Sequence, residues 1–186
     1  MRFFLTLLGA ALFSTGALAA GYSEKKKGDM SDDGLAPTSV KLIVGSNTID
    51  GNDGSKNGVV DRDYFTIKIA QGQHLASIVL QPQTIVGGTF SFIGVQKGKQ
   101  VTVDPNGNSP QGLLGWTHYS DADIGTDLLP AICAGTGAKG CTPPLGPGSY
   151  SFWLQELSAC QCHYRFTFNV TGTDAVIPDE TESEEE

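Results

Sequence analysis

The chain has 186 residues, 24 of them glycine and only 2 methionine, with a formal net charge of −8 at pH 7. This length is enough for one domain with a substantial core, and the glycine-rich composition favours strands and turns over helices. An acidic chain with scattered lysines offers no basic surface to a phosphate backbone, so we exclude nucleic acid as a partner.

The first residues are typical of a secretory signal peptide. Arg2 precedes the apolar stretch 3–13, and Ala17-Leu18-Ala19 fits the small-x-small pattern of a cleavage site. The apolar run is shorter than the roughly 20 residues needed to span a bilayer, which argues against a membrane anchor. We therefore expect a signal peptide over residues 1–20 and a secreted protein without a membrane span, extracellular or periplasmic.

The remaining chain divides into three parts. Residues 21–37 are polar, are broken by glycine and proline, and are typical of an N-terminal linker. Residues 38–172 contain short runs with strand periodicity, separated by turn-rich stretches. Acidic residues dominate 173–186, and like-charge repulsion predicts a disordered tail there.

The runs with strand periodicity predict an all-β fold. They are 39–44, 63–70, 74–80, 90–96, 100–103, 149–155 and 163–171. With only a turn or two of helix near 121–132, about 7–9 such strands form an antiparallel β-sandwich or jelly roll. Alternation predicts that the following side chains face the core: Phe65, Ile67, Ile69, Tyr150, Phe152, Leu154, Tyr164, Phe166, Phe168 and Val170.

Three short motifs carry a resemblance to a known family. They are "DRDYF" at 61–65, "GQHL" at 72–75 and "GSYSF" at 148–152. In this order they resemble the bacterial pre-peptidase C-terminal domain, a secreted β-sandwich found beside exported proteases and also alone. The resemblance covers residues 28–171, although the stretch 105–145 is atypical of that family. These motifs are mostly structural, so they imply the fold more than the ligand.

The resemblance also implies a calcium site, because some members of that family hold calcium near the lead-in and the Asp-x-Asp pair. The candidate ligands are Asp29, Asp32, Asp33, Asp61 and Asp63. Carboxylates on flexible segments supply the oxygens that calcium prefers, provided that the lead-in folds back on the strand. The alternative is that these acids are solvated and only raise solubility.

Two other acidic stretches contain residues that could bind a cation. The segment 50–54 is not an EF-hand loop, because Ser55 stands where glycine is required and Asp61 where a glutamate would close the site. Asp121, Asp123 and Asp127 form a second candidate cation cluster.

The cysteines Cys133, Cys141, Cys160 and Cys162 predict two disulfides in an oxidising compartment. We favour Cys133–Cys141 and Cys160–Cys162, while the other pairings would join the two neighbouring loops. Alternatively, Cys160, Cys162 and His163 supply soft ligands for copper or zinc.

No arrangement of residues indicates an enzyme. His74, His118 and His163 fall in separate segments, and none lies beside an activated nucleophile. The pattern Gly-x-Gly-x-x-Gly at 135–140 lies between two cysteines rather than between a strand and a helix, so it does not predict a phosphate site. We expect a non-catalytic protein.

Aromatic residues supply candidate ligand contacts. Trp116, Tyr119 and Trp153 suit stacking on sugar rings or on an extended protein strand if their rings are exposed. The competing interpretation places Trp116 and Trp153 in the core.

The leading hypothesis is a secreted accessory module that binds an extracellular polysaccharide or protein polymer, or the cell surface, and is stabilised by calcium. One alternative is a periplasmic copper- or zinc-handling protein. Another is a structural surface protein that self-associates through exposed strand edges.

Overall fold

The computed structural model describes residues 20–107 and 109–173. The expected signal peptide, apart from Ala20, and the expected acidic tail, apart from Thr173, lie outside these described residues. Within them, no helix is both long enough and apolar enough to cross a membrane.

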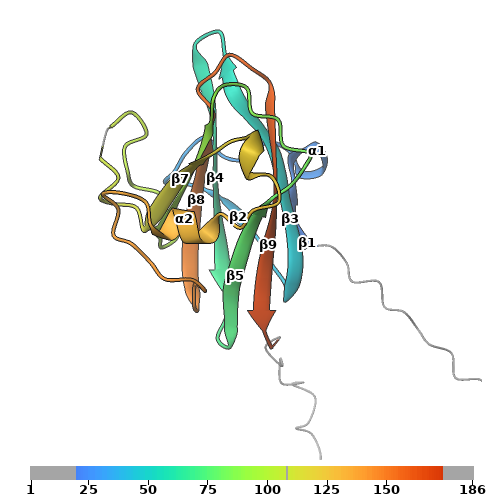
Figure 1. Ribbon diagram of the computed structural model, residues 1–186, viewed down its shortest axis with the longest axis vertical. Helices are drawn as coiled ribbons and strands as arrows, with labels where there is room; N and C mark the ends of the chain where they lie inside the picture. Colours follow the sequence, from blue (N-terminus) through green and yellow to red (C-terminus); the bar gives the residue numbers. More distant parts are fainter. Residues whose placement is uncertain (1–19, 108, 174–186) are drawn as a thin grey trace, which may run out of the picture.

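The strands form two facing β-layers (Figure 1). One layer contains β1 (Ala20–Ser23), β3 (Gly45–Lys56), β9 (Cys162–Gly172) and β5 (Gln73–Leu80). The other contains β2 (Thr38–Val40), β4 (Val59–Ile69), β8 (Gly148–Gln155), β6 (Ser91–Lys97) and β7 (Gly115–Tyr119).

The two layers are continuous at one end, where β3 and β4 form a hairpin. Residues 54–56 pair there with 59–61, so the strand order is β5-β9-β3-β4-β8-β6-β7. The short strands β1 and β2 add in parallel to β3 and β4, and the other pairings are antiparallel. The predicted all-β fold with mainly antiparallel strands is confirmed.

Helices contribute little to this fold. They are α1 (Glu24–Lys27), the 3-10 turn η1 (Asp121–Asp123) and α2 (Leu129–Cys133). The sequence predicts the helical turns near 121–132, but α1 is too short to show a helical period.

Aromatic side chains fill the space between the layers. Phe152 of β8 stacks on Phe65 of β4 at 5.1 Å between ring centroids. Phe168 of β9 meets both rings edge-on, at 5.2 Å from Phe152 and 5.9 Å from Phe65. All the side chains predicted to face the core are buried.

A second, smaller core lies on the outer face of the β4–β8–β6–β7 layer. Tyr64 and Trp153 project from this face, and the connection between β6 and β7 covers them with Val101 and Leu113. Trp153 is therefore buried, although it lies opposite the main core as predicted.

The main difference from the predicted strands is β3, a central strand where the sequence indicates only turns. Its inward-facing residues are Asn47, Ile49, Gly51 and Asp53, and only Ile49 is a large apolar residue. The usual alternation of apolar and polar residues is therefore missing, because this part of the strand lines a polar site.

Other segments also differ from expectation. The predicted strand 39–44 is reduced to β2, and 100–103 forms no strand, although the Val101 amide donates to the Gly34 carbonyl at 2.7 Å. The segment 21–37, expected as a linker, contributes most of β1 and all of α1 and buries Met30.

The cross-layer packing predicts the effect of truncating Phe168. Phe168→Ala removes a buried ring that joins both layers, so we expect a loss of about 3–5 kcal/mol in the free energy of unfolding in urea. Phe90→Ala is the control, because Phe90 is 50% exposed and its loss should change stability by under about 0.5 kcal/mol. Equal effects of the two substitutions would contradict this description of the core.

Candidate metal centre

Gly51 of β3 has no side chain, so it leaves space for other side chains at the buried face of this strand. Gly51 pairs with Tyr164 on β9. A Cβ atom at Gly51 would lie 2.3 Å from the Tyr164 hydroxyl oxygen and 2.7 Å from the Glu24 carboxyl carbon. A glycine is therefore needed here so that both side chains can enter the interior.

Glu24 attaches the N-terminal segment to β3. Its carboxylate accepts hydrogen bonds from the Met30 amide at 3.0 Å and from the Asn52 amide at 2.7 Å. The side chain is only 8% exposed. Burial raises the pKa of Glu24, whereas the two hydrogen bonds oppose this rise.

Asp63 is the acid of the site whose ionised form is most strongly disfavoured by its surroundings. It is fully buried, and among the described residues no group forms a hydrogen bond of good geometry with either carboxylate oxygen, although the Tyr164 hydroxyl and the Glu24 carboxyl lie close enough to influence the pKa of Asp63. Burial, followed by the nearby charge of Glu24, raises the pKa of Asp63 to about 10. A buried, unpaired carboxylate is strongly unfavourable unless it is protonated or bound to a cation.

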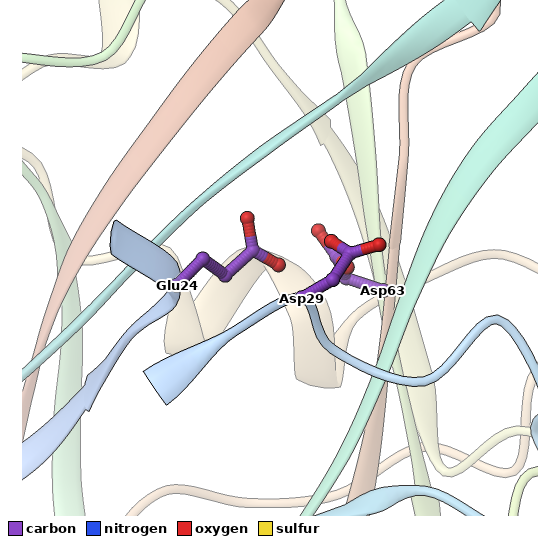
Figure 2. A group of neighbouring side chains, drawn as sticks. All are labelled: Glu24, Asp29 and Asp63. Carbon is purple, nitrogen blue, oxygen red and sulfur yellow. The ribbon is translucent and has the colours of Figure 1, made fainter. Parts of the chain in front are cut away.

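Asp29 completes a group of three carboxylates. Figure 2 shows the carboxylates of Glu24, Asp29 and Asp63 gathered in one place. One oxygen from each lies within 4.8 Å of the other two. Two oxygens that bind one calcium ion at 2.3–2.6 Å are at most about 5 Å apart. The spacing therefore suits a single shared cation, and the exposed Asp29 gives it a path from solvent.

Two further acids extend this negative region. Burial, with Asp29 and Asp32 nearby, raises the pKa of Asp61 to about 6. Burial, with Glu156 and Asp61 nearby, raises the pKa of Asp53 to about 7. Asp53 is 4% exposed, and one of its oxygens has no hydrogen-bond partner.

These outer acids line an open cavity beside the three-carboxylate group. The cavity measures about 690 Å³, and Asp29, Asp32, Asp53 and Asp61 contribute to its wall.

Among the residues that the structure describes, no ion pair joins a cationic side chain to these acids, although Lys56 contributes to the wall of the same cavity. Both ion pairs found among the described residues involve a different acid, Asp50, which lies 3.6 Å from Arg165 and 3.9 Å from His163. Lys27, close to Glu24 in sequence, instead donates to the Gly21 carbonyl at 2.8 Å.

The five acids expected as calcium ligands do not all lie in one group. Asp29 and Asp63 join the group of three, and Asp61 lies beside it. Asp32 accepts a hydrogen bond from the Arg62 amide at 2.9 Å, and Arg62 lies near the start of β4, between Asp61 and Asp63. Asp33 accepts from the Leu35 amide at 2.8 Å in a local turn.

Sequence reasoning missed Glu24 and Asp53. Glu24 precedes three lysines in a stretch expected as a linker, so its sequence context indicates a solvated helix end. Asp53 lies in a segment considered only as an EF-hand loop. The one usable signal was the Asp-x-Asp pair of β4, since Asp63 shares the inward face of Phe65.

In the second candidate cation cluster Asp121 is exposed, and Asp123 and Asp127 have structural partners. Asp123 accepts from the Ser120 amide at 2.8 Å and caps η1. Asp127 accepts from the amides of Ile78 and Leu129, at 2.9 and 3.1 Å. These bonds fix the turn that follows β7.

The cysteines form the favoured disulfides, Cys133–Cys141 and Cys160–Cys162. The alternative pairings are therefore wrong for this state of the chain. The soft-metal interpretation loses two of its three ligands, because the sulfurs of Cys160 and Cys162 are bonded to each other. The ring of His163 contacts the Gln83 carbonyl at 2.9 Å.

The three candidate ligand-binding aromatics are not equally accessible. Tyr119 and Trp153 are buried, so they present no open ring face to a ligand. Trp116 is partly exposed on the outer face of β7.

Comparison with known proteins gives no counterpart, since no family model, curated protein or solved structure matches the chain. The resemblance to the pre-peptidase C-terminal domain therefore stays a prediction.

The buried acids predict that, with metal removed, the protein becomes less stable as pH rises. Unfolded aspartates titrate near 3.9, whereas Asp63, Asp53 and Asp61 keep their protons to about pH 10, 7 and 6 when folded. The folded state therefore binds more protons above pH 4. The free energy of unfolding should fall between pH 4 and 8, by up to about 1.4 kcal/mol per pH unit for each group.

The measurement is a series of urea denaturations in chelator across that range. Asp63→Asn should make the fall less steep over the whole range and remove most of it above pH 7, because the amide does not titrate while Asp53 and Asp61 still do. A profile that rises with pH in the wild type would show that these acids are ionised and stabilised without a metal.

Proposed function

We propose that this protein is a secreted, non-catalytic β-sandwich module that binds an extracellular polymer or the cell surface and is stabilised by calcium. The observation that carries the calcium assignment is the fully buried Asp63, whose carboxylate faces Glu24 and Asp29 and forms no hydrogen bond of good geometry within the described part of the chain. A divalent cation would allow all three groups to ionise together.

The chemistry of the donors favours calcium over other metals. The group offers only carboxylate oxygens, which suit hard cations, whereas zinc and copper prefer imidazole and thiolate. Calcium also tolerates irregular geometry, while magnesium requires a near-ideal octahedron. Glu24 is the first residue of α1, Asp29 follows that helix, and Asp63 lies on β4, so the ion would join the N-terminal segment to the sandwich.

A structural role suits the burial of these acids better than a catalytic one. Asp63 is fully buried and Glu24 nearly so, and neither carboxylate can reach a polymeric substrate at the surface. Both disulfides support an oxidising compartment, in agreement with the expected signal peptide. The bonded sulfurs at Cys160 and Cys162 disfavour the soft-metal alternative.

Thermal unfolding in chelator and then in millimolar calcium tests the metal assignment. A ligand at about 100 times its Kd, bound only to the folded state, adds about 2.7 kcal/mol. For a domain of this size the expected rise in Tm is about 5–10 °C. Glu24→Gln and Asp63→Asn should abolish the rise.

The matched control is Asp121→Asn, because Asp121 is an exposed acid outside the site. It should leave the calcium response unchanged. Magnesium should give a much smaller rise. An equal response to both ions, or a response that survives in the Asp63→Asn variant, would overturn the assignment.

A further inference from the structure

The outer face of β6 and β7 carries a group of aromatic rings that the metal centre does not use. Phe92 on β6 lies opposite His118 on β7. Trp116 lies two residues before His118 on β7, opposite Gly94. Phe90 precedes β6, and its ring centroid is 4.3 Å from that of His118. We call Phe90, Phe92, Trp116 and His118 the aromatic groove.

The rings are held in place before any ligand arrives. Phe92 rests on the buried Trp153, with 4.7 Å between centroids, and lies 6.0 Å from Trp116 in a nearly parallel arrangement. The Trp116 indole nitrogen donates to the Thr136 carbonyl at 2.9 Å. Fixed rings lose little conformational entropy when a ligand stacks on them.

Two hollows meet at these rings. One measures about 280 Å³ and extends from Phe92 and His118 toward Phe90, Gln155 and Leu157. The other measures about 290 Å³ and extends from the same two residues toward Trp116, Asp104 and Pro110. Because the hollows share Phe92 and His118, they lie next to each other across the face of the layer, and we call the two together the track.

The polar side chains of the track indicate the charge of its ligand. Among the described residues that line the two hollows there is no lysine or arginine, whereas Glu156 and Asp104 are acidic. Partial burial lowers the pKa of His118, which keeps its ring neutral near pH 7. Such a lining repels anions and offers hydrogen bonds to neutral hydroxyl groups.

We propose that the aromatic groove binds a neutral polysaccharide chain, with successive sugar rings stacked on Trp116 and on Phe90. A pyranose ring has an apolar C–H face and a rim of hydroxyls, which matches aromatic platforms flanked by Gln155 and Asp104. The rings project from the face of the layer and not from the free edge of β7, so a peptide lying over them would not pair as an added strand. This inference rests on the proposed polymer-binding function and names its ligand class.

The two tryptophans of the chain, Trp116 and Trp153, both lie at the groove, so intrinsic fluorescence reports binding directly. We would titrate the calcium-loaded protein with cellohexaose, laminarihexaose, maltohexaose and chitohexaose, using polygalacturonate as the anionic comparison. At least one neutral hexasaccharide should bind and polygalacturonate should not. Failure of all four neutral sugars would overturn the glycan assignment.

Variants then locate the binding site. Trp116→Ala and Phe90→Ala should each weaken binding about tenfold, as expected for the loss of one stacked ring. For Trp116→Ala the readout is calorimetry, because the more exposed of the two fluorescent reporters is removed. Leu35→Ala is the matched control, since Leu35 is an exposed apolar residue outside the groove. Unchanged affinity in both groove variants would overturn the location.

Co-sedimentation separates this inference from the proposed function. Wild-type protein is mixed with insoluble cellulose, chitin, gelatin and fibrillar collagen. Sedimentation with the protein polymers alone would overturn the glycan inference and leave the polymer-binding function standing. Sedimentation with none of them, together with failure of the hexasaccharide titrations, would contradict both.

Discussion

The burial of the Asp63 carboxylate beside Glu24 is the constraint on which much of the structure depends. Asp63 is buried away from solvent, and in the described ranges 20–107 and 109–173 no cationic side chain or backbone amide is paired with its carboxylate. The surroundings are adapted to these acids: β3 has glycine at position 51 and polar inward residues, and α1 places Glu24 against the Asn52 amide. A cation at this point converts repulsion between carboxylates into attraction between the N-terminal segment and the sandwich.

Arg62 provides a structural link between the metal centre and the aromatic groove. It lies between Asp61 and Asp63, and its amide donates to Asp32. Its guanidinium donates to the Gln155 side chain at 2.9 Å and to the Asn106 side chain at 3.1 Å. Gln155 lines one hollow of the groove, and Asn106 belongs to the loop beside the other. The strand that presents Asp63 inward therefore also supports the groove on the outer face.

Much of the fold was predictable from the sequence, because β4, β8 and β9 alternate apolar and polar residues in the usual way. Strand β3 was not predictable, since its inward positions serve the acids rather than the core. The candidate site was predictable only in part: Asp63 lies on a strand with clear alternation, whereas Glu24 reaches it through the folding back of residues 20–30. Neither sequence spacing nor local periodicity encodes such a long-range contact.

Calorimetric titration of the metal-free protein with calcium at pH 7, repeated in buffers of different ionisation enthalpy, tests the central claim most directly. Asp63 is protonated at this pH when no metal is bound, and metal ligation requires its carboxylate. The account predicts about one ion bound per chain with release of about one proton, and loss of both in the Asp63→Asn variant. Calcium binding without proton release, or no binding, would contradict it.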